Sequence, residues 1–226
     1  DMRCVTTMDK KQLVKLISAF SMADGGLYKK NENGNASFQM NMLTIHDDYI
    51  EWTKSVLEEL IHVNKTKVAN PFKNPQTNLN SRTHPLLTSI HGRIYRDSYK
   101  GLDEHIVNNI DWEVLAIFYM ADGSLHIDKP NPKKGLVNES INIMLHMKRL
   151  SYGDQWFLKK SLKDNLDLEF NINKQFYKGK TYYYLRLRNK DSIKFMDGVR
   201  PYIKESFNYK LYDSVRKAPV KGDDIV

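Results

Sequence analysis

The chain has 226 residues, of which 41% are hydrophobic and 11% aromatic, so it is long and apolar enough to bury a sizeable core. It has no run of about 18 apolar residues, no apolar secretory signal near its first residue and a single cysteine, which excludes a typical transmembrane helix and an internal disulfide bond. Lysine and arginine total 35 against 27 acidic residues. The net charge of +8 predicts a polyanionic partner, either nucleic acid or a membrane surface.

The first half of the chain begins with an apolar helix that ends in the motif Met-Ala-Asp-Gly. Leu13, Leu16, Ile17 and Phe20 follow helical spacing and lead to Asp24. An Asn-Gly pair between two alternating runs then predicts a β-hairpin. The remaining elements are predicted in this order: strands at residues 27–30 and 36–45, a helix at 48–62 with Asp47 as its N-cap, strands at 65–68 and 86–90, and a helix at 93–109.

The second half repeats this pattern. Residues 115–123 end in the same Met-Ala-Asp-Gly motif as residues 17–25, so that Asp122 follows Asp24 by nearly half the chain. The later elements are predicted in this order: strands at 125–128 and 137–147, a helix at 152–165 with Ser151 as its N-cap, strands at 168–176 and 181–188 joined by a Lys178-Gly179-Lys180 turn, and a helix at 192–205.

Each half therefore has the order α-β-β-α-β-β-α, which predicts an α+β (mixed α/β) fold built from two tandem repeats. We expect the first repeat to span residues 8–109 and the second to span residues 110–216, followed by a C-terminal tail at 217–226.

The basic residues concentrate on the predicted strands. Residues 171–190 include six basic and no acidic residues, whereas the helix that begins near Asp47 is mostly acidic. Since alternate side chains of a strand share a face, Tyr182, Tyr184, Arg186 and Arg188 form an aromatic and cationic strip. Such a strip suits phosphates and guanine edges, although a solvated strand face has a similar composition. The same bias in both halves favours DNA as the partner. A membrane surface is disfavoured because the sequence predicts no cationic amphipathic helix that could insert into it.

The two motif aspartates predict a metal site. Two motif helices packed side by side bring Asp24 and Asp122 to one place, where the repulsion between their carboxylates is relieved by a divalent cation. Oxygen ligands suit Mg²⁺, which beside a phosphate supports hydrolysis. A single Asp-Gly after a helix is usually an ordinary helix end and turn, but two copies that open equivalent units indicate a shared site.

These residues resemble the LAGLIDADG homing endonucleases in their single-chain, two-repeat, intron-encoded form, over about residues 11–213. The second motif, Leu-Ala-Ile-Phe-Tyr-Met-Ala-Asp-Gly, is the better match. The first motif lacks the leading Leu-Ala and keeps the Ala-Asp-Gly end. Residues 199–203 and the sequence Tyr209-Lys210-Leu211 are similar to the tail of intron-encoded members.

The resemblance implies a pseudo-two-fold saddle in which two four-stranded antiparallel sheets lie in the DNA major groove and the motif helices form the interface between the halves. It implies a site-specific enzyme that cuts both strands of a long, pseudo-palindromic or asymmetric target across the minor groove and leaves staggered ends. Asp24 and Asp122 would bind the catalytic metals, with the carbonyl groups of Ala23 and Ala121 as further ligands. Mg²⁺ would be the cofactor, Mn²⁺ would substitute for it, and Ca²⁺ would bind without supporting cleavage.

The family also places a basic residue near each scissile phosphate. Lys100, some two dozen residues before Asp122, and Lys210, in the Tyr-Lys-Leu sequence, occupy those places here. Each could stabilise transition-state charge or polarise water. Each lysine taken alone could equally be an ordinary phosphate contact or a solvated side chain.

Side chains on the strands are expected to recognise bases. The loop at residues 69–83, which holds Pro71 and Pro75, is expected to follow the phosphate backbone. The candidates in the first half are Lys29, Gln39, Asn41, Thr44, Lys65, Lys67 and Arg82, and those in the second half are His126, Asn138, Asn142, Lys174, Arg186 and Arg188.

The predicted partner is double-stranded DNA, bound by a monomer. The alternative is a non-cleaving nucleic-acid-binding protein of the same fold, either a maturase for its host intron RNA or a DNA-binding regulator. Loss of a motif aspartate would favour that alternative, and both aspartates are present.

Overall fold

The computed structural model describes residues 8–69, 74–96, 99–130, 140–188 and 191–212. Its first half follows the predicted element order. The elements are α1 (Lys10–Met22), β1 (Gly25–Lys29), β2 (Ala36–Leu43), a 3-10 turn η1 (Thr44–His46), α2 (Asp47–Glu58), β3 (Val63–Val68), β4 (Gln76–Thr83) and α3 (Pro85–Ile94).

A short connection joins the halves, and the second half repeats the order of the first. The connection comprises β5 (Tyr95–Arg96), β6 (Tyr99–Lys100) and α4 (Glu104–Val107). The second half comprises α5 (Trp112–Asp122), β7 (Gly123–Asp128), β8 (Ser140–Leu145), α6 (Tyr152–Leu166), β9 (Asn171–Tyr177), β10 (Lys180–Arg188), α7 (Ser192–Val199) and two 3-10 turns, η4 (Arg200–Tyr202) and η5 (Glu205–Lys210).

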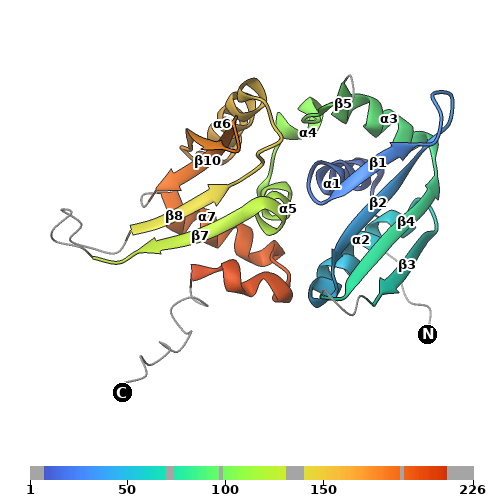
Figure 1. Ribbon diagram of the computed structural model, residues 1–226, viewed down its shortest axis with the longest axis horizontal. Coiled ribbons are helices and arrows are strands. Elements are labelled where there is room, and N and C mark those ends of the chain that lie inside the picture. The colour runs from blue at the N-terminus through green and yellow to red at the C-terminus, as the bar shows by residue number, and fades with distance from the viewer. Residues whose placement is uncertain (1–7, 70–73, 97–98, 131–139, 189–190, 213–226) are drawn as a thin grey trace, which may run out of the picture.

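Two antiparallel sheets of four strands have the same topology, with strand order β1-β2-β4-β3 in one half and β7-β8-β10-β9 in the other. Figure 1 shows the sheets on opposite sides of the motif helices α1 and α5, which lie in the middle of the molecule. The predicted mixed α/β fold of two repeats with two antiparallel sheets is therefore confirmed, and the arrangement is that of a pseudo-two-fold saddle.

The motif helices pack against each other, and each has a small residue that is fully buried. Ala19 of α1 and Ala116 of α5 are fully buried, and α5 is apolar around most of its circumference, as expected of a helix covered on every side. Lys15 of α1 forms ion pairs with Asp111 and Glu113 at the start of α5, at 2.6 and 3.0 Å. The two helices are thus fixed together at the ends that lie away from the motif aspartates.

The prediction for residues 69–94 was wrong. The expected long loop contains β4, which pairs with β2 on one side and β3 on the other, and the expected strand at 86–90 lies inside α3. Pro85 at the first turn and the His84 side chain, which accepts a hydrogen bond from the Leu86 amide, start this helix. Leu87, Ile90 and Ile94 form its buried stripe. Residues 70–73, including Pro71, lie outside the described residues.

Several predicted ends were also wrong. The expected helix at 93–109 is the β5–β6 hairpin followed by the short α4, and the helix expected at 192–205 ends at Val199, ahead of Pro201. Asp47 lies inside the first turn of α2 and is not its N-cap. Ser151 does cap α6, in a reciprocal capping box with Asp154. The predicted tail at 217–226 lies outside the described residues, among which no helix has the length and apolarity needed to span a bilayer.

Candidate active site

The motif aspartates lie at the shared end of the two central helices. Asp122 is the last residue of α5, and Asp24 follows the C-cap of α1. Each is followed by a glycine at which the chain turns into a strand. A Cβ atom on Gly25 would lie 2.4 Å from the Phe38 ring, and one on Gly123 would lie 2.1 Å from the Tyr119 ring, so both positions require glycine for close packing.

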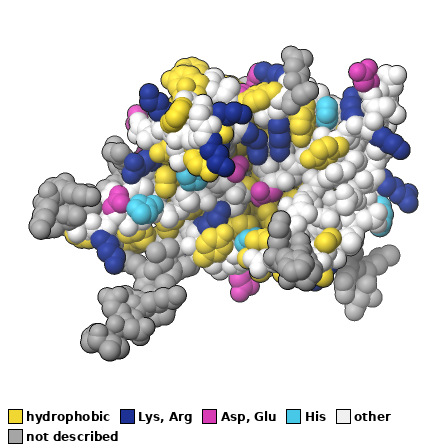
Figure 2. Space-filling view, in the orientation of Figure 1, with side chains coloured by type: hydrophobic (Ala, Val, Ile, Leu, Met, Phe, Trp, Pro, Cys, Tyr) yellow, Lys and Arg dark blue, Asp and Glu magenta, His cyan; other side chains and the backbone are white. Residues whose placement is uncertain are grey.

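The ionised form of the Asp24 carboxyl group is disfavoured by its surroundings, although the side chain is in contact with solvent. Burial of Asp24, followed by the negative charge of Asp122, raises the pKa of this carboxyl group to about 6. The positive charges of Lys210, Arg149 and Lys100 act in the opposite direction without restoring the ordinary value. The structure therefore brings two carboxylates and three cationic side chains into one electrostatic unit. Figure 2 shows basic side chains close to acidic ones at the middle of the molecule, between the sheets.

Lys100 and Lys210, which the family resemblance nominated, both reach the ends of the motif helices. The Lys100 ammonium donates to the carbonyl oxygens of Ala23 and Gly25, at 3.1 and 2.5 Å. Burial, together with the charge of Arg149, lowers its pKa to about 7. This ammonium is therefore poised between its two protonation states near neutral pH.

Lys210 is held in an aromatic cage. Its ammonium donates to the carbonyl oxygens of Tyr119 and Met120, at 3.2 and 2.5 Å, and lies 5.3 to 6.0 Å from the ring centroids of Tyr119, Phe207 and Tyr209. The residue is 8% exposed, and burial lowers its pKa to about 8.

Arg149, which the sequence reasoning missed, is the third cation of the site. Its guanidinium donates to the carbonyl oxygens of Met22 and Ala23, the latter at 3.2 Å, and lies 3.8 Å from the carboxylate of Asp122. It therefore joins the second half of the chain to the end of α1. In the sequence, the pair Lys148-Arg149 lies between a strand and a helix cap, a pattern typical of a solvated turn. The position of Arg149 follows only from the packing of α1 and α5.

The site offers two carboxylates to a hard divalent cation and, in the described part of the chain, lacks a full set of side-chain ligands. Among the described residues, no group of three or more His, Cys, Asp and Glu side chains is placed to hold a metal ion. Two carboxylates completed by water and phosphate oxygens are, however, the donor set that Mg²⁺ prefers. Burial and the charge of Asp122 raise the pKa of Asp24, so its ionised form is disfavoured in the free protein, and a bound cation would favour that form.

The proposed carbonyl ligands differ from each other. The Ala23 oxygen already accepts hydrogen bonds from Lys100 and Arg149, so it could ligate a metal ion after those donors moved. Ala121 lies in the last turn of α5, next to Asp122.

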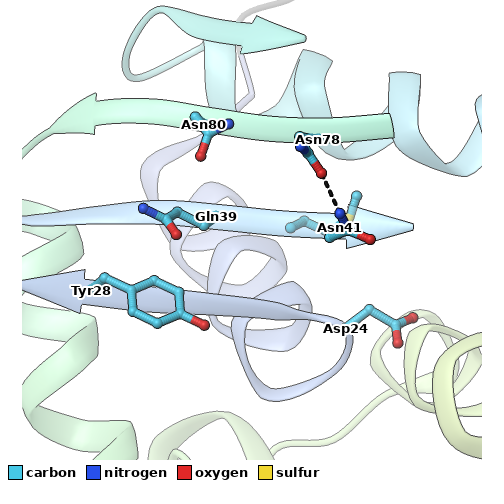
Figure 3. Close-up of a pocket in the computed structure, with 7 residues that line it drawn as sticks. Asp24, Tyr28, Gln39, Asn41, Asn78 and Asn80 are labelled. Atoms are coloured by element: carbon cyan, nitrogen blue, oxygen red, sulfur yellow. Dashed lines mark hydrogen bonds between the residues drawn. The ribbon is translucent and has the colours of Figure 1, made fainter. Parts of the chain in front are cut away.

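The sheet of the first half carries a face rich in amides. Tyr28, Gln39, Asn41, Asn78 and Asn80 surround a hollow of about 380 Å³ that Asp24 borders. Figure 3 shows these side chains on β1, β2 and β4, with Asn41 donating a hydrogen bond to Asn78. Gln39 and Asn41 were predicted from the sequence, whereas Tyr28, Asn78 and Asn80 were not. Alternation along β1 identifies Tyr28 as an outward residue. Asn78 and Asn80 could have been identified in the same way if β4 had been recognised as a strand.

The sheet of the second half has a different surface. The alternation predicted for β10 is confirmed, because Leu185 and Leu187 are buried and Tyr182, Tyr184 and Arg186 keep contact with solvent. The guanidinium of Arg186 donates to the Asn142 side chain at 2.8 Å, and Asn142 in turn donates to Asp128. Asn142 is 1% exposed, so it supports Arg186 from below and offers little surface of its own.

His146 is a further side chain beside the second motif. Its ring lies 5.6 Å from that of Tyr184, it is hydrogen-bonded to Ser124 at 2.8 Å, and its backbone amide donates to the Asp122 carbonyl. The sequence reasoning did not select it, because an isolated histidine after an apolar strand carries no motif.

Four of the predicted DNA-contacting residues do not lie as expected. The ammonium of Lys65 is paired with Asp47 and Glu51 of α2, and Lys67 shares its face of β3, opposite the buried Thr77. Lys174 lies opposite Tyr183, on the face covered by α6, and the Thr44 hydroxyl contacts that of Thr77. For the three lysines the reason is strand alternation, because these positions have the parity of the core-facing residues; Thr44 lies in η1, after β2 has ended.

The remaining candidates are exposed or lie outside the described parts. Arg82 is exposed on β4, and His126 is exposed on β7, where it contacts Asp128 at 2.9 Å. Lys29 is exposed at the end of β1, but it lies opposite the buried Ala36 and shares the parity of the core-facing Leu27. Asn138 lies outside the described residues. Arg188 ends β10, and its side chain also lies outside the described part.

Two four-stranded antiparallel sheets around paired motif helices, with an aspartate at the end of each helix, define a two-repeat saddle fold. Residues 20–195 match the model of the LAGLIDADG DNA endonuclease family, and the chain belongs to that family. No curated protein matches it in sequence.

Solved structures share the fold. One is the homing endonuclease I-WcaI bound to its DNA recognition sequence, with a TM-score of 0.69 and 23% identity over 91% of this chain and 88% of that one. Another is I-DmoI in complex with DNA and Ca, with a TM-score of 0.50 and 17% identity over 82% of this chain and 90% of that one.

Proposed function

We propose that this protein is a site-specific DNA endonuclease that hydrolyses one phosphodiester bond in each strand of a long duplex target, with Mg²⁺ as its cofactor. One observation carries the proposal: the ends of α1 and α5 bring Asp24 and Asp122 into one electrostatic unit with three cationic side chains. Membership of the DNA endonuclease family and the shared fold of DNA-bound relatives support it.

The two aspartates would hold the metal ions between the repeats. A bound Mg²⁺ supplies charge that polarises a phosphate and lowers the pKa of a water molecule. Lys100 and Lys210, whose lowered pKa values are about 7 and 8, would stand beside the two phosphates, to stabilise charge or to accept a proton from water. Arg149 would neutralise charge at the boundary between the repeats.

The two sheets would each read one half of the target through the major groove. The amide side chains of β2 and β4 can pair with adenine, and Arg186 can pair with guanine. Because the two faces differ, the target would be asymmetric, and a monomer would bind it. Cuts made across the minor groove would leave staggered ends.

A selection experiment tests this proposal. A randomised duplex library is incubated with the protein and Mg²⁺, the cut ends are sequenced, and Asp122→Asn is the matched control. We expect paired, offset cuts within one long sequence, absent in the control. Parallel reactions with Mn²⁺ should also cut, and those with Ca²⁺ should bind DNA without cutting. Tight binding without cutting in Mg²⁺ and Mn²⁺ would instead assign a non-cleaving role, and binding to intron RNA in excess competitor DNA would assign a maturase.

A further inference from the structure

The segment that carries Lys210 comes from the second repeat but is anchored on the first. The backbone amide of Ser206 donates to the Asp48 carboxylate at 3.0 Å, and the Ser206 hydroxyl is hydrogen-bonded to His46 Nδ1 at 3.1 Å. Asp48 lies in the first turn of α2, and His46 directly precedes that helix. Ser206, four residues before Lys210, is thus held at the start of the middle helix of the other repeat.

Aromatic contacts reinforce this anchor. The Phe207 ring stacks on His46 with 4.0 Å between centroids, and it meets the edge of Tyr49 at 5.5 Å. The Lys204 ammonium lies 4.2 Å from the centre of the Trp52 ring. All three partners belong to the first repeat, so the approach of Lys210 to the motif helices depends on the surface of α2.

Lys100 shows the reciprocal arrangement. Its neighbour Tyr99 donates its hydroxyl hydrogen to the Asp154 carboxylate and accepts a hydrogen bond from the Ser151 amide. Ser151 and Asp154 form the capping box at the start of α6. Lys100, which closes the first repeat, is thus anchored at the start of the middle helix of the second repeat.

The two anchors are alike in kind and differ in the donor, which is a backbone amide at Asp48 and a tyrosine hydroxyl at Asp154. In each, a carboxylate in the first turn of the middle helix holds the segment next to an active-site lysine of the opposite repeat. A lysine side chain has many rotamers, and reacting groups must be held within a fraction of an ångström, so a fixed backbone is a precondition for directing its ammonium.

We propose that Asp48 and Asp154 are reciprocal positioning residues, each of which sets the lysine of the other repeat, Lys210 and Lys100 respectively, and thereby the cutting of one strand. This inference rests on the proposed function for its strand-specific part. The placement of the lysines is a property of the free protein and can be measured without cleavage.

The first test measures lysine reactivity in the free protein. Each variant is treated briefly with acetic anhydride, and the acetylation of every lysine is quantified by mass spectrometry. We expect Asp48→Asn to increase the labelling of Lys210 about threefold or more and to leave Lys100 unchanged, with the opposite result for Asp154→Asn. Two milder variants keep the test usable if a carboxylate variant folds poorly. Tyr99→Phe removes the hydroxyl that donates to Asp154 and should show the selectivity of Asp154→Asn. Ser206→Ala removes the bond to His46 and keeps the amide bond to Asp48, so it should increase the labelling of Lys210 by less than Asp48→Asn and leave Lys100 unchanged.

The controls remove a carboxylate from the same helices at sites away from the anchors. Glu58→Gln of α2 loses an ion pair with Lys54, and Asp164→Asn of α6 loses one with Lys160. Neither should change the labelling of Lys100 or Lys210. Equal changes at both lysines in an anchor variant, or no change at either, would overturn the inference.

The second test follows the two strands separately on the duplex selected above, labelled differently at each 5′ end. Asp48→Asn and Lys210→Met should slow the same strand, and Asp154→Asn and Lys100→Met should slow the other, by about tenfold to a hundredfold for the aspartate variants. DNA affinity should remain unchanged. Equal slowing of both strands would contradict strand-specific positioning. Selective labelling combined with no cleavage by the unaltered protein would instead overturn the proposed function and retain the anchors.

Discussion

The two sheets have the same topology and different surfaces. The face of the first sheet beside Asp24 is made of neutral amides and a tyrosine, whereas that of the second presents Tyr182, Tyr184 and Arg186, supported by the buried Asn142. Asn80 and Arg186 occupy equivalent places, each directly after a buried leucine that pairs with the second strand of its half, β2 or β8.

This difference shows which parts of a duplicated protein are free to diverge. The motif aspartates and glycines are the same in both repeats: both turns need close packing, and under the proposed function both carboxylates serve one site. The outward positions of the strands bear no packing constraint, so they can specialise. The comparison implies that the repeats act alike in chemistry and differently in recognition.

The largest expected effect tests whether the two repeats contribute equally to the chemistry. Asp24→Asn and Asp122→Asn should each reduce double-strand cleavage by about a thousandfold or more, because either change removes a carboxylate ligand from a shared site. Cleavage is measured on the selected duplex, and binding is measured separately by fluorescence anisotropy in Ca²⁺. Asp164→Asn is the matched control. Substantial cleavage by either motif variant would show that the repeats contribute unequally.

The next effect tests whether the two sheets recognise DNA differently. Arg186→Ala should weaken DNA binding by about 1–3 kcal/mol, relax sequence preference in one half of the target, and lower the slope of log K against log salt by about 1 if the guanidinium contacts phosphate. Asn80→Ala at the equivalent place should relax preference in the other half and leave the salt slope unchanged, because it removes no charge. Identical salt slopes and identical affected half-sites would contradict the contrast between the faces.

Metal dependence should vary with pH through Asp24. Its pKa is raised to about 6, so protons compete with the metal below that pH. The Mg²⁺ concentration that gives half-maximal cleavage should therefore rise about tenfold per pH unit below about 6 and level off above it. Titrations of Mg²⁺ between pH 5 and 8 measure this. A constant requirement across that range would mean that Asp24 does not bind the ion.

The same carboxylate should cost stability in the free protein. Its pKa is about 6 in the folded state against an ordinary 3.8, so the folded state binds more protons between these values and stability falls as pH rises through them. With allowance for screening by solvent, Asp24→Asn should raise the free energy of unfolding by about 1 kcal/mol at pH 7.5 without divalent metal. The gain should vanish below about pH 4, and urea titrations at both pH values measure it.

The smallest effect concerns a lysine that the sequence placed on the wrong face. Lys65→Ala should leave DNA affinity within about twofold and lower the free energy of unfolding by about 0.5 kcal/mol, because its ammonium pairs with Asp47 and Glu51 of α2. A loss of affinity comparable to that of Arg186→Ala would place Lys65 in the DNA interface after all.

The sequence was informative where local pattern decides structure. The motif helices, the Ser151 cap and the alternation of β10 follow from apolar spacing and capping chemistry within a few residues. β4 was missed because residues 76–83 are polar and contain few typical strand formers, and the segment is a strand because it pairs with β2 and β3 on both sides. That pairing is a tertiary effect.

The candidate site divides in the same way. Asp24, Asp122, Lys100 and Lys210 were nominated from motifs and family resemblance, and the structure brings them together. Arg149 has no motif, and its place follows from the packing of two helices far apart in the chain. The lysines of β3 and β9 were assigned to the wrong face because strands were judged by composition, and the register supplied what composition lacked.

The crossed contacts of Ser206 with α2 and of Tyr99 with α6 have a consequence for protein engineering. Hybrid nucleases are built by joining a half from one parent to a half from another. In such a hybrid, the outward strand residues can come from either parent, but the contact pairs Asp48–Ser206 and Asp154–Tyr99 are each divided between the two halves. A hybrid of this protein therefore needs matched pairs grafted across the junction, and the same four positions are where a designer would restore activity to a chimera that binds DNA without cutting it.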